Sequence, residues 1–167
     1  MNNLFTYDIG KSTMFVFDSS KEIRIRKKGE KKEDRIYNPH EYSKEDFLNL
    51  KIHGLKKGDI LVGEDAHMRE SHKQTTAQPF SYDDLVLFDR NIHSENITTR
   101  LFPHSSTPKA RVIAGYEDKG DAIDTISIAK FLKMDKNVFK SLKHFKPTRM
   151  VDYQENDGHI HQYIKNT

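Results

Sequence analysis

One acidic residue stands inside an apolar, β-prone stretch near the start of the chain. Residues 4–18 read Leu-Phe-Thr-Tyr-Asp-Ile-Gly-Lys-Ser-Thr-Met-Phe-Val-Phe-Asp, and Asp8 takes a place where a central strand ordinarily holds an apolar side chain. The run breaks at Gly10 and then resumes, which predicts a hairpin with a polar turn. A buried carboxylate is costly without a cation or metal ion beside it, so we expect partners for Asp8 further along the chain.

The composition is typical of one soluble domain with a heavily charged surface. The 167 residues include 28 basic and 25 acidic side chains, and a net charge of +3 is only a weak indication of a polyanionic partner. The absence of cysteine excludes disulfides, thiolate zinc sites and a cysteine nucleophile. No signal peptide or membrane-spanning run is recognisable, so we expect a cytoplasmic protein with no membrane partner, of cellular or viral origin.

Local patterns predict the order of the elements. Alternation of charged and apolar residues over 22–26 predicts a third strand after the hairpin, and the charged run 27–35 predicts a solvated turn. Ser43 begins a predicted helix of about ten residues. The segments that follow are a buried strand at 58–63, a loop at 65–80, a helix from Ser81, a strand at 97–102, a turn-rich break at 104–108, and helices at 119–132 and 135–146.

These elements predict an α/β fold in one domain spanning residues 1–167. The sheet is mixed and five-stranded, in the order 3-2-1-4-5, with its first three strands antiparallel and helices on its faces. The helix at 135–146 presents lysines outward as an additional basic element. The tail at 147–167, with His159 and His161, has no predicted structure or role.

Four acids are expected to meet at one end of this sheet. Glu64 ends a strand predicted to lie parallel to that of Asp8, while Asp121 and Asp124 share the first turn of a helix. Clustered carboxylates need cations, and hard oxygen ligands suit Mg²⁺ or Mn²⁺. The plainer interpretation is that Asp121 and Asp124 stabilise a helix N-terminus and that Glu64 is the polar end of a strand.

Three motifs together resemble those of a nuclease family. Asp8-Ile-Gly-Lys-Ser, Ile-Leu-Val-Gly before Glu64, and Asp121-Ala-Ile-Asp-Thr-Ile-Ser-Ile-Ala resemble the catalytic motifs of RuvC-like Holliday junction resolvases, in the ribonuclease H-like superfamily. The resemblance covers about residues 4–132. It implies a Mg²⁺-dependent endonuclease, usually a homodimer, that cuts four-way or other branched DNA. It also implies that Asp8 bridges two metal ions, with Glu64, Asp121 and Asp124 completing a catalytic metal site in which Mn²⁺ substitutes for Mg²⁺.

This chain also departs from the family pattern. The segment 109–120 is short for a bacterial member, and in the family it carries part of the dimer and DNA contacts. Lys119-Gly-Asp-Ala-Ile-Asp also resembles a signature of insertion-sequence transposases with a RuvC-like domain. A transposase-derived domain with four acids therefore remains an alternative.

A nuclease needs cations that hold phosphates near the acids. Candidates lie close to predicted strand or helix ends on the acidic side: Lys11, Ser12, Arg69, Lys73, Lys109, Arg111 and Lys119. Any one of them is equally consistent with ordinary surface charge. His67 and His72, just after Glu64, are candidates for water activation or phosphate contact.

Other functions stay open at this point. The Asp-x-Gly-x-Ser pattern at Asp8 also occurs in ATP-binding proteins of the actin and sugar-kinase superfamily, but those need a second glycine-rich loop, and the eight glycines here include no adjacent pair. Cleavage of RNA–DNA hybrids, RNA processing and non-catalytic nucleic-acid binding remain possible within the same fold.

Overall fold

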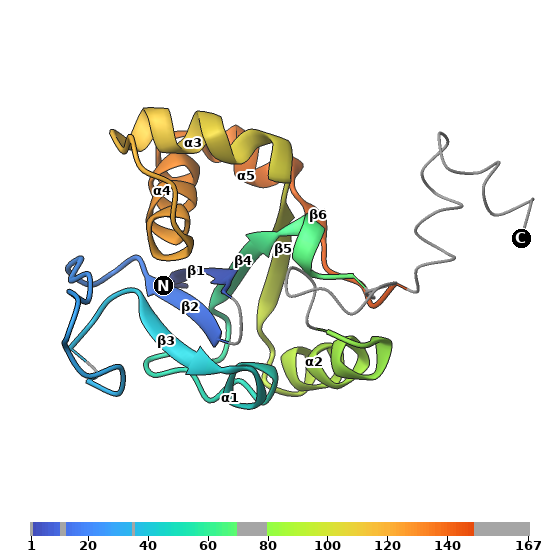
Figure 1. Cartoon of the computed structure of the whole chain (residues 1–167). Helices are drawn as coiled ribbons and strands as arrows, with labels where there is room; N and C mark the ends of the chain where they lie inside the picture. The colour runs from blue at the N-terminus through green and yellow to red at the C-terminus, as the bar shows by residue number, and fades with distance from the viewer. Residues whose placement is uncertain (1, 11–12, 35, 70–79, 149–167) are drawn as a thin grey trace, which may run out of the picture.

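The computed structural model describes residues 2–10, 13–34, 36–69 and 80–148, and these form an open α/β sheet flanked by helices (Figure 1). The six strands are β1 (Leu4–Ile9), β2 (Thr13–Asp18), β3 (His40–Ser43), β4 (Ile60–Glu64), β5 (Thr98–Phe102) and β6 (Lys143–His144). The helices are α1 (Lys44–Leu48), α2 (Tyr82–Ser94), α3 (Thr107–Ala114), α4 (Asp121–Met134) and α5 (Lys136–Ser141), with 3₁₀ turns η1 (Asp65–His67) and η2 (His104–Ser106).

The sheet is mixed, as predicted, and its strand order is β3-β2-β1-β4-β5-β6. β1 and β3 each run antiparallel to β2, whereas β1, β4 and β5 run parallel to one another. The predicted pairing of the two acid-bearing strands, β1 and β4, is confirmed. The predicted order 3-2-1-4-5 is incomplete, because the short β6 adds an antiparallel strand beyond β5.

The prediction of a third strand at 22–26 is wrong, because β3 occupies that place in the sheet. The segment 22–26 contributes only one bridge, between Arg24 and Asn38. The Asn38 side chain accepts from the Asp18 backbone N–H at 2.8 Å and donates to the Asp18 carbonyl at 2.8 Å, so the end of β2 is already paired. Ile23 and Ile25 are each 41% exposed, so their alternation does not mark a buried face.

Helices cover both faces of the sheet, and the alternation along β1 sends side chains into both layers. Phe5, Tyr7 and Ile9 pack on the side of α1 and α2, in one core with Phe47 and Phe88. The other face packs against α4, in a core that includes Val62, Phe102 and Ile128. Thr6 is buried on this second side and donates from Oγ1 to the Thr125 carbonyl of α4 at 2.6 Å. Asp8 follows with the same alternation, so β1 aims it at α4.

The helix starts agree with local capping signals better than the helix ends do. Ser81 and Asp84 form the predicted capping box at the start of α2, and Ser43 caps α1. α1 has only five residues instead of about ten, and Leu50 just beyond it has a positive φ of 57°. α4 matches its prediction closely, and it is buried from Asp124 through Ala129.

The turn predicted at 104–108 is wrong, because η2 and α3 lie there. Pro108 lies in the first turn of α3, where its missing N–H costs no hydrogen bond, and Gly115 ends the helix with φ 86°. The predicted helix at 135–146 is shorter than expected, since α5 ends at Ser141 and β6 follows. Its four lysines are exposed as predicted: Lys136, Lys140, Lys143 and Lys146.

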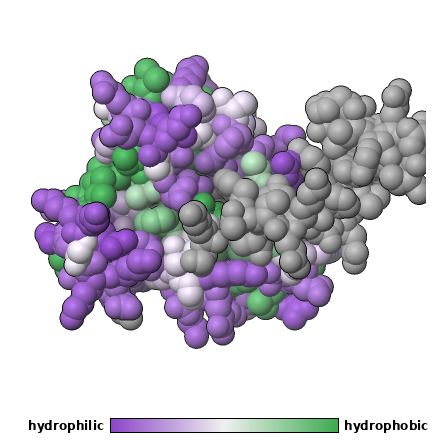
Figure 2. All heavy atoms as spheres, in the orientation of Figure 1, coloured by the Kyte–Doolittle hydropathy of each residue, from purple (hydrophilic) through white to green (hydrophobic). Residues whose placement is uncertain are grey.

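Most of the surface in the view of Figure 2 is hydrophilic, with apolar side chains in small separate areas. Among the described residues, no helix combines the length and apolar character needed to cross a bilayer. The tail at 149–167, including His159 and His161, lies outside the described residues, and so does His72.

Candidate metal centre

Two of the predicted acids lie at the same edge of the sheet. Asp8 is the last residue but one of β1, and Glu64 is the last residue of β4. Because these strands are parallel neighbours, their carboxyl ends meet there. Each residue is only 3% exposed. The sheet therefore buries two carboxylates side by side, on the face covered by α4.

The first turn of α4 brings a third acid to the same place. Asp124 is buried, at 7% exposure, and one carboxylate oxygen each from Asp8, Glu64 and Asp124 lie within 4.8 Å of one another. We call these three residues the three-acid cluster. Three buried carboxylates at this spacing could hold a metal ion, because carboxylate oxygens are the ligands that hard divalent cations prefer.

Asp121 lies near the cluster but is exposed, and it precedes Asp124 by three residues in the same first turn of α4. Its Oδ2 is 3.4 Å from the position that a Cβ on Gly10 would take, so it adjoins the turn that follows β1. Its charge also helps to raise the pKa of Asp8. Asp121 is therefore at the rim of the site, while the three-acid cluster forms its buried part.

The electrostatics of the cluster favour a cation. Burial, and then the charges of Glu64 and Asp121, raise the pKa of Asp8 to about 9, although the Ile9 backbone N–H donates to its Oδ1 at 2.8 Å and partly opposes this rise. Burial disfavours the charged carboxylate most, and the neighbouring negative charges add to this effect. A divalent ion would supply the missing positive charge.

Arg111 partly balances this charge. Its Nε donates to Asp124 Oδ1 at 2.6 Å and its Nη2 donates to Asp124 Oδ2 at 3.1 Å, from the neighbouring helix α3. The hydrogen bond with Asp124 raises the pKa of Arg111, so the guanidinium stays charged. We predicted Arg111 as a phosphate contact, but here its side chain contacts one of the acids.

His104 is a site residue that the sequence analysis missed. Its Nδ1 forms a hydrogen bond with Glu64 Oε2, and its backbone N–H donates to Asp65 Oδ1 at 3.1 Å. Its side chain is 65% exposed, so it lies between the buried Glu64 and solvent. A signal was available in the sequence, because His104 is the second residue after the strand predicted next to that of Glu64.

The other predicted phosphate contacts stay predictions. Lys109 and Lys119 are exposed, and Arg69 is partly buried just beyond η1. Lys109 lies over the ring of Phe131, with Nζ 5.9 Å from its centroid. The remaining three, Lys11, Ser12 and Lys73, lie outside the described residues.

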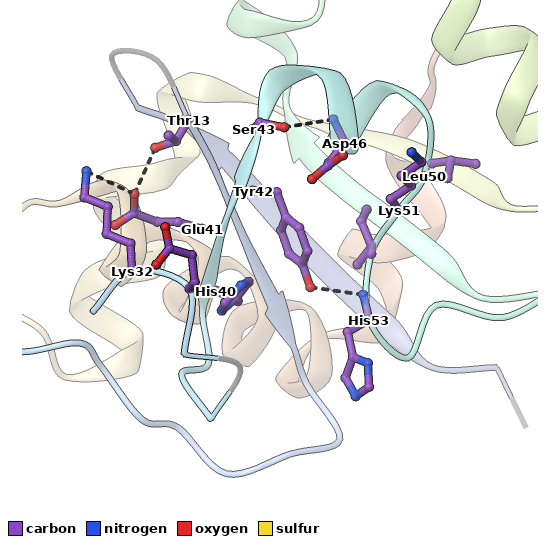
Figure 3. Close-up of a pocket in the computed structure, with 12 residues that line it drawn as sticks. Thr13, Lys32, His40, Glu41, Tyr42, Ser43, Asp46, Leu50, Lys51 and His53 are labelled. Atoms are coloured by element: carbon purple, nitrogen blue, oxygen red, sulfur yellow. Dashed lines mark hydrogen bonds and ion pairs between the residues drawn. The ribbon is translucent and has the colours of Figure 1, made fainter. Parts of the chain in front are cut away.

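The charged segment predicted as a solvated turn is attached to the sheet by Glu41. Glu41 Oε2 lies 3.9 Å from Lys32 Nζ and accepts from Thr13 Oγ1 at 3.2 Å (Figure 3). Its Oε1 accepts from Nη2 of Arg26, just before the segment, at 3.0 Å. A small cavity of about 160 Å³ lies between this segment and α4, lined by Arg26, Lys32, Glu41 and Ala122 among others. Basic side chains thus lie beside the first turn of α4.

A hollow of the described surface that is larger than the cavity beside α4 does not contain the three-acid cluster. It has a volume of about 730 Å³ and runs along β3 and the segment after α1, where Tyr42 Oη accepts from the His53 backbone N–H at 3.0 Å (Figure 3). Its lining residues carry none of the four predicted acids. Because the acids converge elsewhere, we assign the candidate site by its chemistry instead of by cavity size.

Comparisons with protein-family models, with curated proteins and with solved structures found no match. The candidate site therefore rests on the positions, burial and charge of its own residues.

Proposed function

We propose that this protein is a metal-dependent endonuclease with a ribonuclease H-like fold that cleaves branched DNA. The observation that carries the proposal is the burial of Asp8, Glu64 and Asp124 within 4.8 Å of one another at the carboxyl ends of two parallel strands. The open mixed sheet with helices on both faces is compatible with that fold, although β6 adds a strand to the predicted order. The acids are those on which the resemblance to RuvC-like resolvases rests.

The cluster fits Mg²⁺, with Mn²⁺ as a substitute. Its donors are all carboxylate oxygens, and a cation would favour the ionised form of Asp8, whose pKa is raised by burial first and then by the charges of Glu64 and Asp121. Asp8, Glu64 and Asp124 would hold the ion, and Asp121 is placed to contribute from the rim. When bound, such an ion lowers the pKa of a water molecule and stabilises the charge that develops on a phosphate.

The protein's own residues supply the rest of the reaction. Asp8 must release its proton to act as a ligand, which the bound cation makes favourable. His104 holds Glu64 from the solvent side through its hydrogen bond to Oε2. Two exposed cations of the predicted set, Lys109 and Lys119, would hold the phosphates on either side of the bond that is cut.

The test compares cleavage of end-labelled substrates by wild-type protein and two variants. The substrates are a four-way junction, a flap, a linear duplex and an RNA–DNA hybrid, each with Mg²⁺, Mn²⁺ or a chelator. We expect cuts in the junction with either ion, and cleavage reduced at least about 10³-fold in Asp8→Asn, because removing a core ligand removes the ion's contribution to the transition state. The control Asp83→Asn, at an exposed acid on α2, should cleave normally.

The substrates also separate the alternatives. Cleavage of the hybrid alone would replace the branched-DNA assignment with an RNA–DNA hybrid nuclease. Tight junction binding without cleavage in any ion would indicate a non-catalytic module. Sedimentation of the protein with and without junction checks the homodimer that symmetric cutting of a junction requires.

A further inference from the structure

Arg111 of α3 forms two hydrogen bonds with Asp124, a member of the three-acid cluster on the neighbouring helix α4. The two hydrogen bonds, 2.6 Å and 3.1 Å, use both oxygens of Asp124, in the parallel arrangement by which a guanidinium binds a carboxylate. The side chains are only 15% and 10% exposed, so water screens the pair weakly. Every oxygen that Asp124 could offer to an ion therefore already has a charged donor.

The surroundings of Arg111 hold it in this place. Helices α3 and α4 pack against one another, Arg111 lies in the last turn of α3, and Asp124 lies in the first turn of α4. Glu64 also acts electrostatically on the guanidinium, although less than Asp124 does. Arg111 is thus a partly buried cation within reach of the charges of the cluster, and the two hydrogen bonds described above are with Asp124.

We propose that Arg111 competes with the divalent ion for Asp124. The inference rests on the metal site of the proposed function and adds a residue that regulates its occupancy. An ion that takes an oxygen of Asp124 shares that oxygen with a hydrogen bond from Arg111, which weakens the bond, and the ion meets the positive charge of the guanidinium at close range. Arg111 therefore weakens ion binding and stabilises the protein when no ion is bound.

This competition couples ion binding to nucleic-acid binding. A guanidinium displaced from Asp124 has free donors, and a phosphate oxygen is a suitable acceptor for them. A phosphate at the site therefore favours release of Asp124, and release of Asp124 favours the ion. Linkage of this kind is reciprocal, so a nucleic acid that contacts Arg111 raises the affinity for the ion.

The experiment measures Mn²⁺ binding to the purified full chain by the electron paramagnetic resonance signal of free Mn²⁺. We expect Arg111→Gln to bind Mn²⁺ about tenfold more tightly or better than wild type, because one nearby positive charge is lost. Without metal, this variant should unfold at a lower temperature, and Mn²⁺ should raise its unfolding temperature more than that of wild type. Arg90→Gln, which removes an exposed charge on α2, should bind Mn²⁺ as wild type does.

Arg111→Lys is a second variant, which keeps the positive charge but lacks the paired donors of the guanidinium. Its gain in Mn²⁺ affinity over wild type should be smaller than that of Arg111→Gln. If Arg111→Gln folds only when Mn²⁺ is present, the ion replaces the guanidinium and the proposal stands. If Arg111→Gln does not fold at all, Arg111→Lys decides: tighter binding supports competition and unchanged or weaker binding overturns it.

The outcomes also separate this inference from the proposed function. Measurable binding by wild type with equal or weaker binding by Arg111→Gln overturns the competition alone, because the metal site would still exist. No binding by either protein overturns both. A third outcome is that wild type binds Mn²⁺ and Arg111→Gln binds it more tightly, but neither protein cleaves any nucleic acid. This result would overturn the nuclease assignment and leave the competition intact.

Discussion

The ring of Tyr7 lies directly over Gly63, its partner in the register of β1 and β4. A Cβ at position 63 would be 2.1 Å from Cε2 of Tyr7, which is far inside van der Waals contact. Tyr7 is 1% exposed and also packs on Phe47, with ring centroids 4.8 Å apart. Glycine is therefore required here by packing, one residue before the metal-site candidate Glu64.

We predict that Gly63→Ala destabilises the protein by about 3 kcal/mol, since the methyl group must displace a fully packed ring. The measurement is urea denaturation followed by circular dichroism. A double-mutant cycle with Tyr7→Leu is the control, because the shorter side chain gives the methyl group room. If Gly63→Ala costs as much in the Tyr7→Leu background, the ring is not the cause.

The hydrogen bond from Thr6 to the Thr125 carbonyl links β1 to α4 in the core, two residues before Asp8. Thr6→Val keeps the shape of the side chain but removes the donor, so we expect a loss of about 1 kcal/mol in the free energy of unfolding. Thr99→Val, at a buried threonine of β5, measures the general cost of the same replacement. An equal loss in both variants would show that the link to α4 contributes nothing specific.

Asp8 should make the ion-free protein less stable as the pH rises. Burial and the charges of Glu64 and Asp121 raise its pKa from 3.8 to about 9, so the folded protein holds a proton that the unfolded chain releases. Stability from this group is complete below about pH 4 and is lost as the pH rises towards about 9. Asp8→Asn should therefore unfold at a higher temperature than wild type at pH 8 in chelator, and the gap should narrow towards pH 5.

Asp18→Asn is a control for the same pH series, because its change in unfolding temperature relative to wild type should have the opposite sign to that of Asp8→Asn. Burial tends to raise the pKa of Asp18, but hydrogen bonds from Asn3 and Ser20 outweigh it and lower the pKa. Ionised Asp18 thus stabilises the fold above its ordinary pKa, so Asp18→Asn should be less stable than wild type at neutral pH.

Mn²⁺ should raise the unfolding temperature of wild type but not of Asp8→Asn. A parallel pH dependence in wild type and Asp8→Asn would contradict the raised pKa.

Glu41 should keep the basic segment around Arg26 and Lys32 attached to the sheet. Glu41→Gln removes the charge that both cations contact, and we expect trypsin to cut the segment about fivefold faster, in keeping with the loss of about 1 kcal/mol of local ion pairing. The cleavage sites are mapped by mass spectrometry. Glu45→Gln, on α1, is the matched control, and a wild-type cleavage rate in Glu41→Gln would assign the ordering of this segment to other contacts.

The features of the fold that sequence predicted well are those with a local cause. The capping box at Ser81 and the apolar α4 depend on near neighbours in the chain. The burial of Asp8 also depends on near neighbours, because side chains alternate between the two faces of a strand. Convergence of Asp8 with Glu64 followed from one further rule, that parallel strands end at the same edge of a sheet.

The missed features depend on contacts between distant segments. The alternation at 22–26 is a valid strand pattern, but Asn38 takes the hydrogen-bonding groups at the end of β2 that such a strand would need. Helix α3 was hidden by serines and Pro108, which are as common in turns as at helix starts. Because α3 was missed, nothing in the sequence indicated that Arg111 would contact Asp124.

The wide separation of the three acids has a consequence for synthesis. Asp8 leaves the ribosome long before Asp124, and α4 must emerge and dock on β1 before the last ligand arrives. A nascent chain that stops short of α4 therefore holds at most two of the three acids. Any property that needs all three acids therefore arises only after α4 has been synthesised and has docked on β1.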